Sequence, residues 1–357
     1  MFSHACLHVH LVFLFDFLTE YLQEPETLTQ ACNEFWHGGA TSGGNRWFDK
    51  SMQILVTKNG RIAYQGEHSM LDAAPTIAVI RRIIKTSYAR LSKKFEDYGD
   101  VDQDYVEAGV TNVFEGCWKD PDLLRKVQND TEKAKEHHNQ VSNLFELDTV
   151  QFTDFGKKQV KQWGYDGPLM AQMAIQLAGY RLFGELVGCY EAASTRAFLH
   201  GRTETTRPVS PETLAFVQSM SDKTSTDADK MEALNTAISV IGEYQANAAA
   251  GKAVDRHLFG LVSMLKDGEE SPDLFSDPLF QRAKTYRLST SSVIFTPGFG
   301  PVHEKGLGVG FNAEKDGFTY IVTARKENDH AKPFCKLLVE ALKEIGALVQ
   351  AAQTSET

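Results

Sequence analysis

Phe318–Ala324, which reads FTYIVTA, carries the clearest strand pattern in the 357-residue chain. β-Branched and aromatic residues fill it without Gly or Pro, which is typical of a strand inside a sheet. Residues 293–318, just before it, place glycines between short β-type runs. After it, Pro333–Ala352 has the apolar spacing of an amphipathic helix. The C-terminal part of the chain is therefore predicted to pack a terminal helix against a sheet.

Further elements are predicted upstream by the same criteria. Leu169–Phe183 is apolar nearly all round, as expected of a buried helix. Asn59-Gly60 marks the turn of a hairpin. The predicted hairpin covers Met52–Ala63, and the other predicted helices cover Thr76–Leu91, Asp120–Leu147, Pro211–Met220 (with Ser210 as N-cap) and Met231–Leu265. Helices mixed with strands in this way predict an α/β or α+β fold.

The amino-acid composition limits which classes of function the protein can have. The length suggests about two domains, and the 42% hydrophobic and 24% charged residues are typical of a globular protein. A net charge of −10 argues against binding to nucleic acid, which requires an excess of Lys and Arg on one face. The cysteines are scattered and never at CxxC spacing, so neither a disulfide framework nor a metal site is predicted. They favour a reducing compartment.

The N-terminal stretch Leu7–Leu18 is apolar but contains His8, His10 and Asp16. It has no positively charged region before it and is too short to span a bilayer. We interpret it as a buried strand or helix, and we identify no clear targeting signal in the chain.

His68 and Asp72 form a His-x-x-x-Asp pattern between the hairpin and the next helix. The spacing would place both side chains on one helical face if the helix has begun by then. Histidine is the side chain whose ordinary pKa suits a general base near neutral pH. A histidine with an acid four residues on also arises by chance, so on this pattern alone a structural histidine is the better interpretation.

A set of motifs in fixed order changes that balance. They are NRWFDK (Asn45–Lys50), EHS (Glu67–Ser69), FGK (Phe155–Lys157), QMAIQLA (Gln172–Ala178), YEAASTR (Tyr190–Arg196), GRTET (Gly201–Thr205), DRHL (Asp255–Leu258), LSTS (Leu288–Ser291) and FGPV (Phe299–Val302). In this order they closely resemble the choline/carnitine acyltransferase family. His-x-x-x-Asp is itself typical of CoA-dependent acyltransferases, in which the histidine is the base.

The resemblance implies two chloramphenicol-acetyltransferase-like domains with mixed sheets flanked by helices. Family members are longer than this chain, so we expect only the C-terminal part of the family fold, with the first domain incomplete. Residues 45–120 would form the end of that first domain, including His68, and residues 121–357 the second domain with the CoA and carnitine sites. Residues 1–44 stay unplaced by these motifs.

The activity implied by the resemblance is reversible acyl transfer between CoA and the hydroxyl of carnitine, with acetyl favoured. His68 would be the base, without a covalent intermediate, a metal or a tightly bound cofactor, and acyl-CoA would be a co-substrate. The alternatives are a medium- or long-chain carnitine enzyme and a truncated, non-catalytic remnant. Family membership further implies a monomer, if complete, in mitochondria or peroxisomes, acting on small molecules.

The resemblance also assigns the CoA end of the site. Lys157 and Lys161 would meet the 3′-phosphate of CoA, and Asp166 would contact CoA nearby. As a bare pattern, two lysines four residues apart are more often a solvated helix face.

At the acceptor end, the resemblance assigns Arg256, Tyr190 and Thr203 to the carnitine carboxylate. The planar fork of arginine suits a carboxylate, which favours carnitine over choline; alone, Asp255-Arg256 would be an ordinary helix ion pair. The resemblance also implies that Ser289 contacts carnitine and that Phe299 lies beside its trimethylammonium group. Ser291 would donate a hydrogen bond to the oxyanion, an interaction that can stabilise a transition state by several kcal/mol. Asp72 would support His68.

Among the departures from the family pattern, two bear on the acceptor pocket and on acyl-chain length. Ala192 stands where members usually have a serine, which removes one hydroxyl from the expected carnitine pocket. Acyl-chain length is set largely two residues before Phe299, where a bulky side chain favours acetyl and glycine admits longer chains. Pro297 is neither, so this position leaves chain length open.

Overall fold

The structure is a computed structural model that describes residues 14–16, 26–38, 43–57, 59–69, 71–91, 116, 119–293 and 295–355. The chain divides into two compact units. The first comprises Met1–Pro25 and His37–Asn143, and the second comprises Glu26–Trp36 and Leu144–Thr357. The sequence places a domain boundary between residues 120 and 121, whereas the compact units divide after Asn143. Whether these units match the two expected acyltransferase domains stays a prediction.

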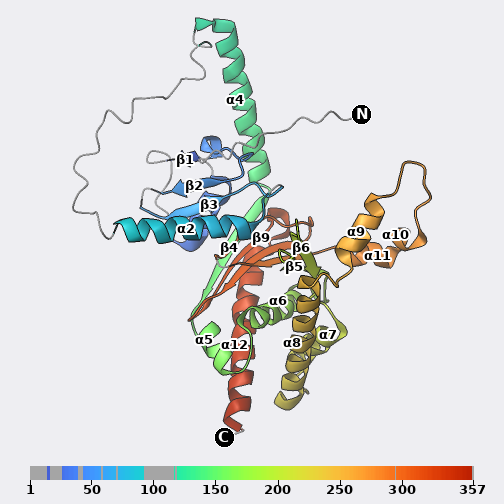
Figure 1. Ribbon diagram of the computed structural model, residues 1–357. Coiled ribbons are helices and arrows are strands. Elements are labelled where there is room, and N and C mark those ends of the chain that lie inside the picture. The colour runs from blue at the N-terminus through green and yellow to red at the C-terminus, as the bar shows by residue number, and fades with distance from the viewer. Residues whose placement is uncertain are drawn as a thin grey trace. The chain divides into compact units, whose positions relative to one another are not determined.

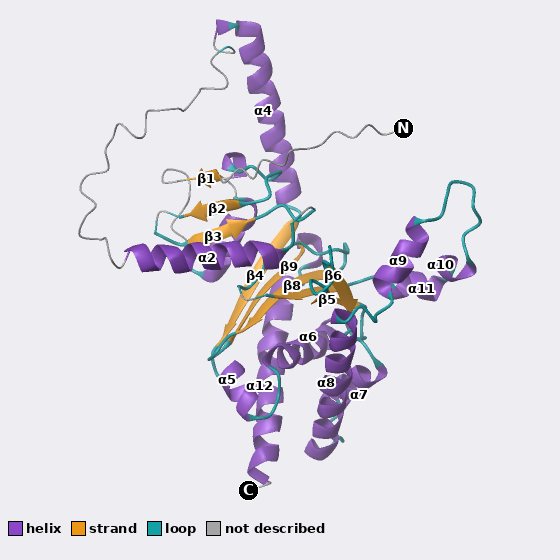
Figure 2. Cartoon of the chain, viewed as in Figure 1, coloured by secondary structure: helices purple, strands orange, loops and turns teal. Residues whose placement is uncertain are grey.

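The second unit is built on a six-stranded mixed sheet in the order β4-β9-β8-β7-β5-β6. Figure 2 shows this sheet in orange. Its strands are β4 (Phe145–Phe152), β5 (Cys189–Ser194), β6 (Thr203–Thr206), β7 (Leu288–Ser292), β8 (Leu307–Ala313) and β9 (Phe318–Arg325). The pairs β8–β7 and β7–β5 are parallel, and the pairs at both ends of the sheet are antiparallel. The fold is thus α/β with a mixed sheet flanked by helices, as the sequence predicts.

One face of this sheet is covered by α5, α6, α7, α8 and α12 (Figure 1). In chain order the unit contains α1 (Leu28–His37, of which His37 belongs to the first unit), α5 (Lys157–Gln162), α6 (Gly167–Phe183), α7 (Pro211–Ser221), α8 (Asp227–Ala249), α9 (Asp255–Ser263), α10 (Asp273–Ser276), α11 (Pro278–Ala283), the 3-10 turn η3 (Lys326–Asn328) and α12 (Ala331–Ser355). Among them, α6 and α12 pack on each other and on the sheet.

Alternation along the strands separates the two faces of the sheet. In β9, Phe318, Tyr320 and Val322 are buried in the core that α6 and α12 complete. Successive strand residues point to opposite faces, so Thr319, Ile321 and Thr323 belong to the other face. We call the first the helix face and the second the site face. Each large apolar side chain buried on the helix face contributes about 1.5–3 kcal/mol to folding.

The buried helix α6 confirms the sequence prediction for Leu169–Phe183. Every residue from Met170 to Gly179 is buried. Asp166 caps its start by accepting from the Leu169 N–H at 3.3 Å, and Gly184 ends it with a left-handed φ of 72°. Its position is therefore set from both ends as well as by its apolar surface.

The first unit contains a three-stranded sheet in the order β1-β2-β3. Its elements are β1 (Leu14–Asp16), η1 (Gly43–Asn45), β2 (Gln53–Val56), β3 (Ile62–Gln65), α2 (Ala73–Leu91) and α4 (Pro121–Ser142). β2 and β3 pair antiparallel, which confirms the predicted hairpin, and Gly60 has the positive φ of 78° that its turn requires. His138 of α4 stacks on Phe48, with ring centroids 5.2 Å apart, and holds that helix to the unit.

Three sequence predictions differ from the structure. The helix expected over Asp120–Leu147 ends at Ser142, because residues 145–152 pair with β9 as strand β4. The helix expected over Met231–Leu265 is two helices, α8 and α9, separated at Gly251, whose φ is 72°. Strands β5, β6 and β7 were not expected, because their polar residues hide the alternation. Among the described residues, no helix combines the length and the apolar character needed to span a membrane.

Candidate active site

Strands β5 and β7 bring three of the predicted residues to the site face. In their parallel register Tyr190 is the partner of Ser289, and Ser291 follows two residues later on the same face. Cys189, next to Tyr190, points to the helix face, where it accepts a hydrogen bond from Gln172 of α6 at 3.4 Å. The hydroxyls of Tyr190, Ser289 and Ser291 thus belong to a single surface of the sheet.

The backbone around Phe299 lies directly on this surface. A Cβ atom at Gly308 would stand 2.5 Å from the carbonyl oxygen of Phe299, and one at Gly310 would stand 1.5 Å from that of Pro297. Only glycine allows so close an approach. The Thr323 hydroxyl donates to the Phe299 carbonyl at 2.5 Å and secures it. Since Gly308 pairs with Ser289 in the sheet, Phe299 is held beside the β7 serines.

Arg256 converges with Tyr190 and Thr203. Its Nε donates to the Thr203 carbonyl at 3.1 Å, and one terminal nitrogen donates to the Tyr190 hydroxyl at 3.3 Å and to the Thr203 hydroxyl at 3.4 Å. The guanidinium carbon lies 6.0 Å from the centre of the Tyr190 ring. The structure therefore brings together the three residues predicted for one carboxylate, around an exposed, permanently charged group.

Asp255 does not pair with the neighbouring Arg256. Its carboxylate forms a two-point ion pair with Arg207, which donates from Nε at 2.9 Å and from a terminal nitrogen at 2.5 Å. The ordinary ion pair considered for Asp255-Arg256 is therefore absent, and the guanidinium of Arg256 is left to its Tyr190 and Thr203 contacts. Sequence reasoning missed Arg207, although it follows the quoted GRTET motif by two residues.

His68, in the first unit, is oriented by backbone. Its Nδ1 lies 2.9 Å from the carbonyl oxygen of Leu71 and 3.7 Å from a carboxylate oxygen of Asp72. A carbonyl only accepts, so the contact assigns a proton to Nδ1, and in the neutral imidazole Nε2 would then be the basic nitrogen. The side chain is 70% exposed. Helix α2 begins at Ala73, so His68 and Asp72 meet in the preceding loop and not on a helical face.

The predicted CoA residues lie on the short helix α5 and at the start of α6. Lys157 begins α5 and Lys161 lies one turn further, both exposed. Gly156 lets this helix approach the β8–β9 turn, because a Cβ there would stand 2.0 Å from the Gly317 nitrogen. Asp166 serves α6 as its N-cap. Its predicted contact with CoA stays a prediction, as do those of the two lysines.

Comparison with known proteins places this arrangement in a family. The sequence matches the Choline/Carnitine o-acyltransferase family over residues 11–340. The chain belongs to the choline/carnitine acyltransferase family. The match begins at residue 11, so it includes most of the segment 1–44 that the motifs left unplaced.

Its relatives act on two different acceptors by name. A mitochondrial carnitine O-acetyltransferase of Saccharomyces cerevisiae is 34% identical over 81% of this chain and 42% of its own length. A choline O-acetyltransferase of Danio rerio is 32% identical over 89% of this chain and 50% of its own length. The chain spans about half the length of the curated relatives it matches. A solved chloramphenicol acetyltransferase, at 10% identity and a TM-score of 0.31 over 56% of this chain and 89% of its own, adds nothing to this assignment.

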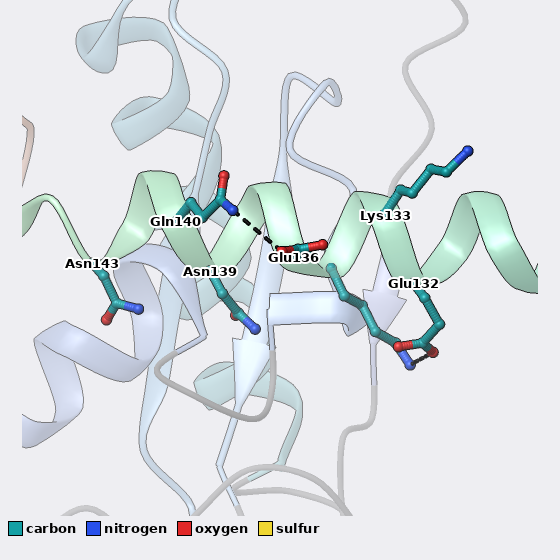
Figure 3. A pocket seen from close by; sticks show the side chains of 7 residues that line it. Glu132, Lys133, Glu136, Asn139, Gln140 and Asn143 are labelled. Atoms are coloured by element: carbon teal, nitrogen blue, oxygen red, sulfur yellow. Dashed lines mark hydrogen bonds and ion pairs between the residues drawn. The ribbon is translucent and has the colours of Figure 1, made fainter.

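A surface hollow in the first unit lies apart from the predicted site residues. It runs along α4, where Glu132, Lys133, Glu136 and Gln140 are among the side chains that line it (Figure 3). Charged and amide side chains of one solvated helix form its walls, and none of the predicted acyltransferase residues is among them. Within the described ranges, no cluster of His, Cys, Asp and Glu has the arrangement of a metal site.

Glu191 is an ionisable group that sequence reasoning did not single out. It is 3% exposed, on the helix face of β5, and its Oε2 has no hydrogen-bond partner among the described residues. Burial, and secondarily the charge of Asp166, raises the pKa of its carboxyl from 4.5 to about 7. Burial likewise raises the pKa of the Cys189 thiol to about 12, so this cysteine is no nucleophile.

Glu191 should make the stability of the protein fall as pH rises. The unfolded chain loses the Glu191 proton near pH 4.5 and the folded chain near pH 7, so the free energy of unfolding decreases between these values, by up to about 3 kcal/mol. Glu191→Gln should therefore stabilise the protein at pH 8 and have little effect at pH 5, as measured by urea unfolding. Glu232→Gln, on the exposed side of α8, is the control. An equal effect of Glu191→Gln at both pH values would contradict the buried, raised-pKa carboxyl.

Proposed function

We propose that the chain catalyses reversible acyl transfer between CoA and the hydroxyl of carnitine, with acetyl as the acyl group. The convergence of Arg256, Tyr190 and Thr203 on the site face, in a chain of this family, carries the proposal. A fixed guanidinium with neighbouring hydroxyls is suited to a carboxylate, which carnitine has and choline lacks. On the likeness to the yeast relative, we infer a mitochondrial location.

His68 is the general base in this proposal. Its Nε2 accepts the proton of the carnitine hydroxyl while the hydroxyl oxygen attacks the thioester carbonyl. The carbon–sulfur bond then breaks, and the CoA sulfur takes the proton back from His68. The Leu71 carbonyl supports this role, because its contact with Nδ1 favours a proton on that nitrogen, and Nε2 is then the basic nitrogen of the neutral imidazole. Asp72 lies close enough to favour the charged imidazolium that forms between the two steps.

Ser291 and Phe299 complete the acceptor end of the proposed site. Ser291 shares the site face with Tyr190, where its hydroxyl is suited to donate to the oxyanion of the tetrahedral intermediate. Phe299 offers a ring to the trimethylammonium group, an attraction of about 0.5–2 kcal/mol depending on desolvation. Its backbone, seated on Gly308 and secured by Thr323, supports a fixed position for that ring. Lys157 and Lys161 are proposed for the 3′-phosphate of CoA.

The direct test is release of free CoA thiol by this chain from acetyl-CoA, with carnitine or choline as acceptor. Turnover that depends on carnitine and is weaker with choline is expected. No acceptor-dependent release with either compound would refute the proposed activity, and faster release with choline would refute the proposed acceptor. Longer acyl-CoA donors, run in parallel, decide the acyl-chain length.

His68→Asn should reduce the turnover number by about a hundredfold or more, because general-base catalysis typically contributes that much. The asparagine amide can still donate to the Leu71 carbonyl but offers no basic nitrogen, so the loop is preserved while the base is removed. The measurement is steady-state thiol release, with acetyl-CoA binding followed by calorimetry. His137→Ala, on the exposed face of α4, is the control. Retention of more than half the activity by His68→Asn would show that another group is the base.

Arg256→Ala should weaken the use of carnitine by about thirtyfold to a thousandfold, since losing a charged hydrogen-bonding partner in a confined site costs roughly 2–4 kcal/mol. The KM for acetyl-CoA should change little, and the preference for carnitine over choline should narrow. Arg256→Lys keeps the charge without the fork, so its effect should be intermediate. A parallel loss with choline and carnitine would make Arg256 a structural residue and not a carboxylate ligand.

Replacing Lys157 and Lys161 together by Ala should raise the KM for acetyl-CoA about tenfold or more, because charge-assisted contacts to phosphate are lost. The penalty should be much smaller with acetyl-dephospho-CoA, which lacks the 3′-phosphate. Lys158→Ala, in the same helix and equally exposed, is the matched control. Equal penalties on the two donors would place the lysine pair away from the 3′-phosphate.

A further inference from the structure

We propose that Arg207 and Asp255, assisted by Tyr286, are positioning residues that hold the guanidinium of Arg256 in the geometry required for the carboxylate of the acceptor. This inference rests on the proposed function of Arg256 as carboxylate ligand. None of the three positioning residues needs to contact the substrate.

The Arg207–Asp255 pair is well built. Arg207 approaches both carboxylate oxygens of Asp255 in the two-point geometry that makes such pairs both strong and directional. The side chain of Asp255 is only 11% exposed. Arg207 is also fixed from a second direction, because its other terminal nitrogen donates to the Ala283 carbonyl at 2.7 Å. The pair therefore anchors the first residue of α9, directly before Arg256, to the chain that follows β6.

The backbone of Arg256 is anchored to β6 as well. Its N–H lies 3.3 Å from each carboxylate oxygen of Glu204, whose side chain is largely buried at 5% exposure. Glu204 and Arg207 belong to one short stretch of chain, so residues 255 and 256 are both fixed to the same support. The guanidinium of Arg256 then folds back onto Thr203 of this strand.

In the part of the chain that the structure describes, α9 has little apolar burial to hold it in place. The helix has no buried residue, and the side chains of Phe259 and Met264 are 67% and 77% exposed. Val254, at its N-cap position, makes no side-chain capping hydrogen bond. A helix with little apolar burial depends largely on its polar contacts for its position. The Arg207–Asp255 pair is therefore expected to control where Arg256 lies.

Tyr286 connects the Arg207–Asp255 pair to Tyr190, the second side chain proposed to bind the carboxylate of the acceptor. Its hydroxyl lies 3.3 Å from Asp255 and 3.2 Å from Arg207, and its ring packs edge-on against Tyr190 with centroids 5.5 Å apart. Burial raises the pKa of Tyr286 to about 12, so the hydroxyl keeps its proton and donates it to Asp255. Through this ring, the network that fixes Arg256 also supports Tyr190.

The first test observes Arg256 without using enzyme activity. In a ¹H–¹⁵N spectrum of the folded chain, the Arg256 Nε–H should give a slowly exchanging signal, because it donates to the Thr203 carbonyl; Arg256→Lys assigns the signal by removing it. Asp255→Asn, which keeps the size of the side chain, and Arg207→Lys, which keeps the charge, should each broaden or lose it. An unchanged signal in both folded variants would overturn the proposal.

The second test separates positioning from chemistry. Arg256 is proposed to bind a part of the acceptor that does not react, so a misplaced guanidinium should weaken carnitine binding, and Asp255→Asn should raise the KM for carnitine about tenfold or more. The KM for acetyl-CoA and the turnover number at saturating carnitine should stay within about twofold. A fall in the turnover number with an unchanged carnitine KM would overturn the positioning role.

Glu344→Gln is the matched control. It removes another two-point pair, with Arg181 at 2.7 Å for both bonds, that joins α6 to α12 on the helix face. Glu344→Gln should change neither the Arg256 signal nor the KM for carnitine. If it changed both as much as Asp255→Asn does, the effect of Asp255→Asn would be due to general destabilisation and not to the loss of positioning. If the wild-type chain does not use carnitine, the proposed function fails, and the Arg256 signal still decides whether Asp255 and Arg207 position that side chain.

Discussion

The parallel register between β5 and β7 is the constraint on which the proposed acceptor site depends. Because Tyr190 is paired with Ser289, the side chains of both strands are divided between the faces in a fixed way. A shift by one residue would place Cys189 and Glu191 on the site face and send the hydroxyls into the core. The apolar packing of Leu288 against α6, where Gly179 leaves room for it, opposes such a shift. Apolar packing on the helix face thus determines which side chains lie on the site face.

Glycine performs a second positioning task on the same sheet. The backbone of Pro297 and Phe299 can lie on β8 only because Gly308 and Gly310 have no side chains. Val309 and Phe311 are buried on the helix face of β8, whereas the alternating residues Gly308 and Gly310 present no side chain on its site face. Together with the polar support of Arg256, this arrangement gives the site face two independent means of fixing residues on loops and short helices.

Much of the helical structure could be predicted from the sequence, because its signals are local. Pro211 after the cap Ser210 and the nearly all-apolar α6 need no tertiary information. Strands β5 and β7 could not be predicted, because polar residues are buried in them, such as Glu191 in β5 and Ser289 and Thr290 in β7. Thr290 satisfies its hydroxyl across the strands, with a 2.8 Å bond to the Tyr190 carbonyl that no local pattern reveals.

The candidate site, too, could be predicted from the sequence only in part. The residues assigned by family resemblance, such as Tyr190, Thr203 and Arg256, are brought together by the structure, although their roles stay predictions. The pair of Arg207 with Asp255 was missed because its partners lie 48 residues apart, and no local pattern relates them. The buried carboxyl of Glu191 was missed for a similar reason, because only the packing of helices such as α8 on β5 makes it a buried group.

The central claim is that Arg256 binds the carboxylate of the acceptor. The most direct measurement is the ¹H–¹⁵N signal of the Arg256 guanidinium while carnitine, and separately choline, is added to the chain. Binding of the carboxylate predicts a saturable shift of this signal with carnitine and none with choline at the same concentrations. A carnitine titration that shifts other resonances of the chain while leaving the Arg256 signal in place would contradict the claim.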